Sequence, residues 1–550
     1  MTRSTPLYAL KLLLRNAIIC LLWVTLHSTH LIPVAAAQAK GKPSVPLAER
    51  IQRVENGLAP VSLDESESPL QLSLERLMKL YKIPGLSLAV IDNYKIAWAK
   101  GYGVTEAGAA TPVTTRTLFM AGSIAKTPTA AGALALVEQG KLALDENVNQ
   151  RLKTWKVPEN EFTAQQKVTL RRILSHSAGL TVHGFPGYTT GEPLPTLVQV
   201  LNGEKPANTA PVRVDFVPGT KWRYSGGGVL IEQQLMMDVT GKQFPQLMRE
   251  IVFDKIGMND STYEQLLPPA RAAQAASGTY ASGKTVAGKW HVYREMAAGG
   301  LWTTPTDLAN FAIEIALSKQ GKSNRILTEA MTREMLKTQM DRVGEVALGD
   351  FQHVDRMGLG FFLGDASRPD LFGHIGDDEG FQAMLYMFGD SGQGAVIMAN
   401  SENGILLGDL LLSIIAKEYG WKNYVPSNRP QIGSSAVLLS VARQKGVKAA
   451  TQAYRQLKKM ESPQYGLNQE TLIGLGYTLL AENKLQDAIE VMKLEVHEYP
   501  DYWNAYDSLG ELYMNAGEKQ LAIENYEKSV QLKPDNDGGI EALKKLKGQS

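Results

Sequence analysis

A serine and a lysine stand three residues apart in AGSIAKT, residues 121–127, and could act as a nucleophile and its base. Both lie at the start of an apolar segment with helical spacing, so Ser123 and Lys126 would share one helix face. A helix N-terminus stabilises an oxyanion and lowers the pKa of a nearby lysine, and a buried neutral lysine can accept the serine proton. The motif alone equally fits a helix-capping serine beside a solvated lysine, because chance supplies about one or two Ser-x-x-Lys in such a chain.

Two further motifs follow at intervals of roughly 100 and 150 residues. In RYSGGG (223–228), Tyr224 precedes a glycine run and can serve as a second acid–base group where neighbouring cations keep it partly ionised. In GHIGDDEG (373–380), His374 stands on an expected strand, and Gly376 lets a substrate backbone approach closely. Taken singly, such a tyrosine fits a turn and such a histidine fits core packing. The three motifs in this order are much rarer than any one of them.

With these motifs, residues 65–420 resemble the serine β-lactamase and penicillin-binding-protein superfamily, in the branch of class C β-lactamases, D-peptidases and related esterases. Further matching stretches are IPGLSLAV, LRRILSHSAGL and AAGGLWTTPTDLA. The resemblance implies that Ser123 is the acylated nucleophile, Lys126 its proton acceptor and Tyr224 the base that later activates the deacylating water. It also implies an oxyanion hole made by the N–H groups of Ser123 and Asp377. Because the sequence has no H-E-x-x-H motif, no Walker loop and no convincing dinucleotide fingerprint, we expect no metal and no other cofactor.

Two departures from the family's motifs concern substrate binding. Gly226 stands where the second motif often has an asparagine, whose amide would hold the amide of the substrate. His374-Ile375-Gly376 replaces Lys-Thr-Gly, so the fixed cation and the hydroxyl that grip a β-lactam carboxylate are missing, and a histidine is mostly neutral near pH 7 unless a carboxylate raises its pKa. We therefore expect His374, Gly376, Asp377 and Gly226 to form the substrate site of an esterase or D-peptidase with weak or no β-lactamase activity.

Two other stretches imitate catalytic motifs. GDSG (389–392) echoes the nucleophile loop of serine proteases, but it lies between two apolar β-rich runs and is typical of a hairpin turn. His176 in LSHSAG could be taken for a triad histidine, yet that stretch is structural in the family that the chain resembles, so we expect a structural role.

The first 39 residues have the pattern of a secretory signal peptide. A basic start precedes the apolar run AIICLLWVTL, which is short for a bilayer span, and small residues follow at signal-peptidase spacing. An uncleaved membrane anchor is the alternative. Cleavage would remove the single cysteine, Cys20, and leave an exported protein, periplasmic or secreted, without a stable membrane span. We interpret residues 40–65 as a linker.

The catalytic motifs need a scaffold, and residues 66–425 predict one. Residues 85–103 predict a β-hairpin, residues 123–142 a helix, and residues 371–400 two or three antiparallel strands. Strands at both ends with helices between them indicate an α+β fold. By resemblance, it is an antiparallel sheet flanked by helices with an all-helical insertion, as in β-lactamases and transpeptidases.

A sequence that repeats every 34 residues follows. LGYTLLAENKLQDAIEVMKLEVHEYP (475–500) and LGELYMNAGEKQLAIENYEKSVQLKP (509–534) carry Leu, Gly, Ala and Pro at matching positions, which is the tetratricopeptide pattern. We place this all-α repeat domain at 466–548, after a linker and degenerate helical repeat at 426–465. Stacked helix pairs usually present a groove to a peptide or protein, but so few repeats also suit a brace for the catalytic domain, and the sequence leaves both open.

The balance of charged residues argues against nucleic-acid binding. The 550 residues carry 57 Lys and Arg against 56 Asp and Glu, which gives no basic footprint for nucleic acid. The leading hypothesis is an exported serine hydrolase that acts through an acyl-enzyme on Ser123 and takes a small-molecule or peptide substrate. The alternative is a catalytically impaired, penicillin-binding-like protein whose repeats bind a protein partner. The intact set of Ser123, Lys126 and Tyr224 argues for the enzyme.

Overall fold

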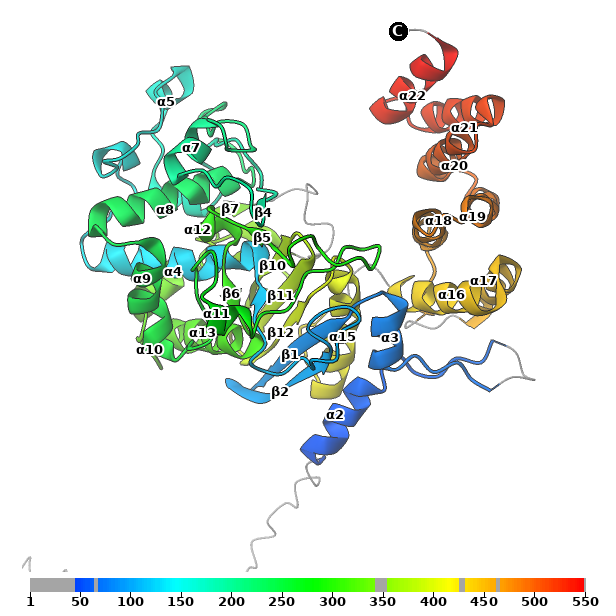
Figure 1. Cartoon of the computed structure of the whole chain (residues 1–550), viewed down its shortest axis with the longest axis horizontal. Coiled ribbons are helices and arrows are strands. Elements are labelled where there is room, and N and C mark those ends of the chain that lie inside the picture. The colour runs from blue at the N-terminus through cyan, green and yellow to red at the C-terminus, as the bar shows by residue number, and fades with distance from the viewer. Residues whose placement is uncertain (1–44, 64–67, 342–353, 425–430, 461–464, 549–550) are drawn as a thin grey trace, which may run out of the picture. The chain divides into compact units, whose positions relative to one another are not determined.

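The computed structural model describes residues 45–63, 68–341, 354–424, 431–460 and 465–548 (Figure 1). The predicted signal peptide and Cys20 lie outside the described residues. Part of the expected linker is helical, since α2 covers Leu47–Glu55. Among the described residues, none of the helices combines the length and the apolar character that a membrane crossing requires.

An antiparallel sheet of eight described strands, ordered β2-β1-β12-β11-β10-β9-β8-β7, forms the centre of the domain that carries the three motifs. The predicted hairpin is present as β1 (Gly85–Asp92) and β2 (Lys95–Gly103). The predicted strands at 371–400 are β10 (Leu371–Asp378), β11 (Phe381–Phe388) and β12 (Gln393–Ala399), and GDSG is the turn between the last two. The remaining strands are short: β9 (Phe362–Gly364), β8 (Val354–Met357) and β7 (Met340–Asp341). Because β1 pairs with β12, the two ends of the domain's sequence meet in one sheet.

The central strands are buried on both faces, which explains their nearly continuous apolar runs. Successive residues of a strand point to opposite faces. Accordingly, Ala89 and Ile91 of β1 belong to one core cluster with α13 (Pro305–Lys319), and Leu88 and Val90 belong to a second with α15 (Gly404–Tyr419). The sheet is thus held between helical layers (Figure 1).

A largely helical segment lies between β2 and β7 and carries two of the three motifs. Its long helices are α4 (Lys126–Glu138), α8 (Gly226–Thr240) and α13. The shorter helices are α5 (Glu161–Gln165), α6 (Leu170–Leu174), α7 (Leu197–Asn202), α9 (Phe244–Met248), α10 (Asp254–Ile256), α11 (Pro269–Ala272), α12 (Met296–Gly299) and α14 (Glu329–Met335), and α3 (Leu74–Leu80) precedes the sheet. Two-stranded ladders also occur there, β3 (Phe119–Met120) with β6 (Trp302–Thr303) and β4 (Tyr188–Thr189) with β5 (His291–Val292).

The C-terminal region consists of helix pairs, as the repeat predicts. They are α16 (Gln431–Lys445) and α17 (Val447–Met460), α18 (Thr471–Ala481) and α19 (Leu485–Glu498), and α20 (Trp503–Asn515) and α21 (Lys519–Leu532), followed by α22 (Asp537–Lys547). The repeated glycines stand where paired helices cross. A Cβ added at Gly476 would lie 2.7 Å from Met492 Cε, and one at Gly510 would lie 3.1 Å from the Tyr526 ring.

The first helix pair contacts the catalytic domain. Arg443 of α16 donates a hydrogen bond to the Leu80 carbonyl at the end of α3 and also pairs with Glu482. Lys82 lies 3.6 Å from the same Glu482 carboxylate. These contacts favour a bracing role for α16.

Candidate active site

Ser123 lies in a tight 3-10 turn, Gly122–Ala125, directly before α4. Helix α4 has Ala125 at its N-cap and no side-chain capping bond, so the capping alternative for Ser123 does not hold. The turn is possible because of Gly122, which has φ +52° and whose added Cβ would lie 2.4 Å from the Asp377 nitrogen. The Ser123 turn and the Asp377 backbone therefore lie side by side, as the predicted oxyanion hole requires.

Strand β10 supplies the other wall of the site. Its neighbour β9 pairs with it at Phe372 and Gly373, and β10 then packs against the Ser123 turn. At Gly376, an added Cβ would lie 1.8 Å from the Ala121 carbonyl oxygen. The close approach that the sequence analysis assigned to a substrate backbone at Gly376 is thus made by the chain's own Ala121.

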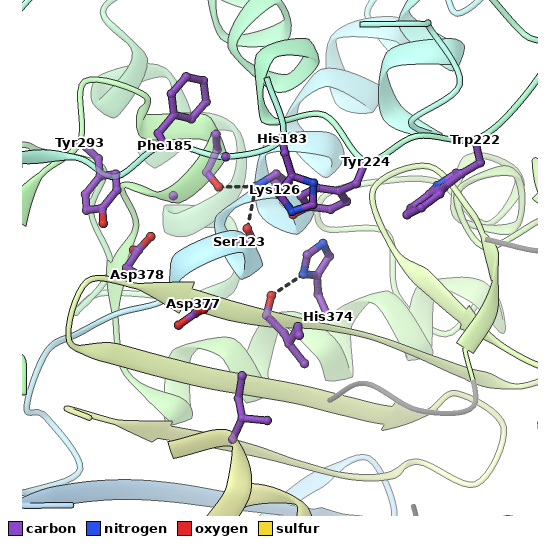
Figure 2. Close-up of a pocket in the computed structure, with 15 residues that line it drawn as sticks. Ser123, Lys126, His183, Phe185, Trp222, Tyr224, Tyr293, His374, Asp377 and Asp378 are labelled. Carbon is purple, nitrogen blue, oxygen red and sulfur yellow. Dashed lines mark hydrogen bonds between the residues drawn. The ribbon is translucent and has the colours of Figure 1, made fainter. Parts of the chain in front are cut away.

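The Lys126 side chain is buried, with 4% of its surface exposed, and points at the nucleophile (Figure 2). Its amine lies 2.9 Å from Ser123 Oγ and donates a 2.5 Å hydrogen bond to the Ala298 carbonyl. Burial lowers the pKa of Lys126 to about 7, and the carboxyls of Asp378 and Glu232 only partly oppose that shift. A large fraction of Lys126 is therefore neutral near pH 7 and able to take a proton.

Tyr224 stands beside Lys126, with its ring centroid 5.1 Å from the amine. Its hydroxyl is buried and, among the described residues, has no hydrogen-bond partner of good geometry. Burial raises the pKa of Tyr224, which outweighs the lowering effect of the nearby Ser123 hydroxyl. In the free protein the phenol is therefore neutral, not partly ionised as the sequence analysis suggested, and Lys126 is the base of the resting site.

His176 positions Tyr224. Its ring centroid lies 4.4 Å from that of Tyr224, and its Nδ1 accepts a 3.3 Å hydrogen bond from the Ser225 N–H. Burial and the charge of Lys126 lower the pKa of His176 well below its usual value. A buried neutral histidine that holds the second motif agrees with the structural role expected from the sequence.

His374 of the third motif is also buried and neutral. Its Nδ1–H donates a 2.6 Å hydrogen bond to the Ile375 carbonyl, which leaves Nε2 as an acceptor without a partner in the described part of the chain. Burial lowers the pKa of His374 to about 3, and the charge of Lys126 adds to that shift. The third motif therefore presents an uncharged ring acceptor where relatives with Lys-Thr-Gly have a cation.

These groups meet in a cavity of about 250 Å³. Five predicted residues line it: Ser123, Lys126, Tyr224, His374 and Asp377. Other residues that line it were not among the predicted site residues, namely His183, Phe185, Trp222, Tyr293 and Asp378 with some further neighbours. Figure 2 shows Tyr293 and Asp378 on one side of Ser123 and Trp222 on the other.

Gly226 does not line the cavity, although it was predicted to. Its N–H donates a 2.9 Å hydrogen bond to the His183 carbonyl, and an added Cβ would lie 3.0 Å from that oxygen and 3.0 Å from the Phe185 ring. The segment from His183 to Phe185 therefore crowds the place where relatives often carry the asparagine.

Asp378 is the most informative residue that the sequence analysis missed. It ends β10, is 9% exposed, and its Oδ2 is buried with no hydrogen-bond partner in the residues described. Burial raises the pKa of Asp378 well above its usual value. The sequence did contain a signal for Asp378: every second residue of a strand points to the same face, so residues 374, 376 and 378 share one face of β10.

No cluster of three or more His, Cys, Asp and Glu side chains suited to a metal ion occurs within the described residues.

The family model for beta-lactamase matches residues 71–412, so this chain belongs to the beta-lactamase family. A tetratricopeptide repeat model matches residues 504–536. The family and the fold thus place this chain among the serine hydrolases of the β-lactamase and penicillin-binding-protein family.

Relatives in sequence are moderately similar. The chain is 26% identical over 342 residues to penicillin-binding protein 4 of Amycolatopsis lactamdurans. The matched stretch covers 60% of this chain and 84% of that protein. It is 29% identical over 235 residues to the unguisins hydrolase ungD of Aspergillus violaceofuscus. That match covers 40% of this chain and 39% of the hydrolase.

Solved structures show the fold. The octameric penicillin-binding protein homologue from Pyrococcus abyssi superposes with a TM-score of 0.54 at 21% identity, over 67% of this chain and 80% of that one. The D-amino acid amidase from Ochrobactrum anthropi SV3 gives a TM-score of 0.51 at 19% identity, over 69% and 99%.

Proposed function

We propose that this protein is an exported serine hydrolase that cleaves an ester or amide bond through an acyl-enzyme on Ser123. One observation carries the proposal: a buried lysine with a pKa of about 7 lies 2.9 Å from the serine hydroxyl. An ordinary lysine, with a pKa near 10.4, would hold its proton at pH 7. Export rests on the pattern of residues 1–39 alone.

The reaction begins when Ser123 Oγ attacks the substrate carbonyl and its proton passes to Lys126. The N–H groups of Ser123 and Asp377 hold the oxyanion. The tetrahedral intermediate then collapses, the bond to the leaving group breaks, and the proton moves through Lys126 or Tyr224 to the leaving oxygen or nitrogen. Water attacks the acyl-enzyme after giving a proton to the same pair, and the acid and free Ser123 are released.

Efficient β-lactam turnover is not part of the proposal. Neutral His374 supplies no cation for a β-lactam carboxylate, Ile375 supplies no hydroxyl, and Asp377 and Asp378 add carboxyl groups to the same cavity. An esterase or D-peptidase activity fits these side chains better.

We also propose that the repeats beyond α16 bind a protein partner, because tetratricopeptide units usually do. The alternative function, a catalytically impaired protein that only recruits partners, would need an inert Ser123. A single measurement therefore separates the two.

The test is the intact mass of the purified protein after treatment with a fluorophosphonate. A single adduct on Ser123 that disappears in Ser123→Ala supports the enzyme. Ser282→Ala, which changes an exposed serine in a turn, is the matched control and should label like the parent protein. A folded parent protein without an adduct would favour the recruiting function.

A further inference from the structure

The cavity beside Ser123 holds a buried carboxyl oxygen for which the proposed mechanism has no use. Asp378 Oδ2 has no hydrogen-bond partner among the described residues, although the side chain is more than nine-tenths buried. A buried polar atom without a partner costs free energy, because it has lost its hydrogen bonds to water and gained none in the protein. A site that keeps such an atom beside its nucleophile is incomplete without a ligand.

Neighbouring protein groups do not complete Asp378. Its Oδ1 lies against Gly299, where an added Cβ would be 3.0 Å away, and the Gly122 N–H interacts with the carboxylate. The Lys126 amine is directed to Ser123 and to the Ala298 carbonyl. The Tyr293 hydroxyl accepts the Glu379 N–H, and its own O–H makes no hydrogen bond to Oδ2. Within the described residues Oδ2 thus has no donor, and a bound substrate can supply one.

The cavity favours a donor that carries a positive charge. Asp378 lines the cavity together with Asp377, whereas His374 is a neutral acceptor. A substrate carboxylate would meet these acidic side chains, but an ammonium group would satisfy Oδ2 and, together with the charge of Lys126, would oppose the effect of burial on the Asp378 carboxylate. A charge-assisted hydrogen bond of this kind is about twice as strong as a neutral one.

The position of Asp378 indicates which part of the substrate carries the amine. Asp378 and Tyr293 lie together on one side of Ser123, away from Trp222 and His374 (Figure 2). The cavity of about 250 Å³ is smaller than the roughly 300–1,000 Å³ of a pocket for a drug-sized ligand. A small acyl group that bears its own amine near the scissile carbonyl fits these limits.

We propose that Asp378 binds the protonated amino group of an aminoacyl substrate, so that the enzyme cleaves amides or esters of amino acids whose α-amino group is free. The inference rests on the proposed function, because it names the acyl group that Ser123 accepts. In the covalent step the Ser123 Oγ–acyl bond forms, the bond to the leaving group breaks, and the serine proton passes through Lys126 to the leaving group. The substrate ammonium stays paired with Asp378 throughout and exchanges no proton.

The experiment compares alanine p-nitroanilide with N-acetylalanine p-nitroanilide, each in D and L form, on the full-length protein. We expect kcat/KM for the free amine to exceed that for the acetylated substrate by about 30-fold or more, the effect of one buried charge pair. In Asp378→Asn that ratio should fall close to one. Glu379→Gln removes a charge from the adjacent residue, which does not line the cavity, and should keep the parent ratio.

A second measurement needs no variant and covers the case in which Asp378→Asn does not fold. Alaninamide should slow fluorophosphonate labelling of Ser123 in the parent protein at a concentration at least tenfold lower than lactamide, its neutral isostere. Equal protection by the two amides would overturn the inference.

The outcomes separate this inference from the proposed function. If Ser123 is labelled and p-nitrophenyl butyrate is hydrolysed, but free and acetylated alanine substrates react alike, the function stands and the aminoacyl specificity is wrong. The specificity is equally wrong if Asp378→Asn slows both anilides by the same factor, because Asp378 would then act only through Lys126. If Ser123 is neither labelled nor active on any ester or amide, the proposed function fails and the inference falls with it.

Discussion

The Lys126 amine bridges the Ser123 hydroxyl, 2.9 Å away, and the Ala298 carbonyl, 2.5 Å away. The carbonyl can only accept, so it fixes one N–H of the amine and orients the rest of the group. When Lys126 is neutral, its lone pair is free to take the Ser123 proton. Helix α12, which carries Ala298, therefore helps to aim the base at the nucleophile.

The pH dependence of acylation should follow Lys126. Because burial lowers its pKa to about 7, the neutral, active fraction should fall about tenfold for each pH unit below 7 and reach a plateau above about pH 8. The rate of Ser123 labelling by a fluorophosphonate, measured from pH 5 to 9, reports this limb directly. Lys126→Arg stays charged, so labelling should be at least about 10²-fold slower. A parent rate that is flat between pH 5 and 8 would show that Lys126 is not the base.

Tyr224→Phe should slow turnover without lowering the stability of the fold. The change removes a buried hydroxyl that lacks a good partner but keeps the ring stacked on Phe362 and packed against His176, so the melting temperature should not fall. Hydrolysis should slow by about 10²-fold or more, since the second acid–base group is lost, and the acyl-enzyme should accumulate in the intact-mass spectrum.

Tyr263→Phe is the matched control for Tyr224→Phe. The Tyr263 hydroxyl is equally buried but donates a 2.5 Å hydrogen bond to the Ala125 carbonyl. Its removal should lower the stability by about 1 kcal/mol and should not cause the acyl-enzyme to accumulate. If the two variants behave alike, Tyr224 serves packing and not catalysis.

Gly376→Ala should damage the fold at the active site. Its Cβ would lie 1.8 Å from the Ala121 carbonyl oxygen, a backbone atom that cannot turn aside, so β10 and the Ser123 turn would be forced apart. We expect a loss of stability of about 1–3 kcal/mol and no Ser123 labelling. Gly474→Ala, in α18 with open space at its Cβ, should instead leave stability unchanged or raise it by up to about 1 kcal/mol. A labelled, stable Gly376→Ala protein would contradict the close packing of β10 on the turn.

The sequence predicted the parts of this site that depend on local spacing. Ser123 in the 3-10 turn and Lys126 at the start of α4 lie together as their spacing predicts, and the apolar runs around His374 predict the strand that carries it. Two features of the site depend on packing between segments that are distant in sequence, and these were not predicted. The neutral state of Tyr224 arises from burial among side chains far away in sequence. The unpartnered oxygen of Asp378 shows only once β10 lies against the Ser123 turn.

Gly226 was placed correctly in its motif but given the wrong surroundings. It was expected to line the substrate site, yet the His183–Phe185 segment lies against it. That segment is separated from Gly226 by about 40 residues of chain, and neither periodicity nor turn chemistry predicts such a contact.

The crowding at Gly226 predicts how the missing asparagine could be restored. In Gly226→Asn the new Cβ would lie 3.0 Å from both the His183 carbonyl and the Phe185 ring, so the single variant should displace that segment and slow Ser123 labelling severalfold. Phe185→Ala removes the ring, so the double variant should recover the labelling rate and acylate faster with penicillin than Phe185→Ala alone. Intact mass after timed exposure to each reagent measures both rates. If Gly226→Asn alone labels as fast as the parent protein, the Phe185 ring does not exclude a side chain at residue 226.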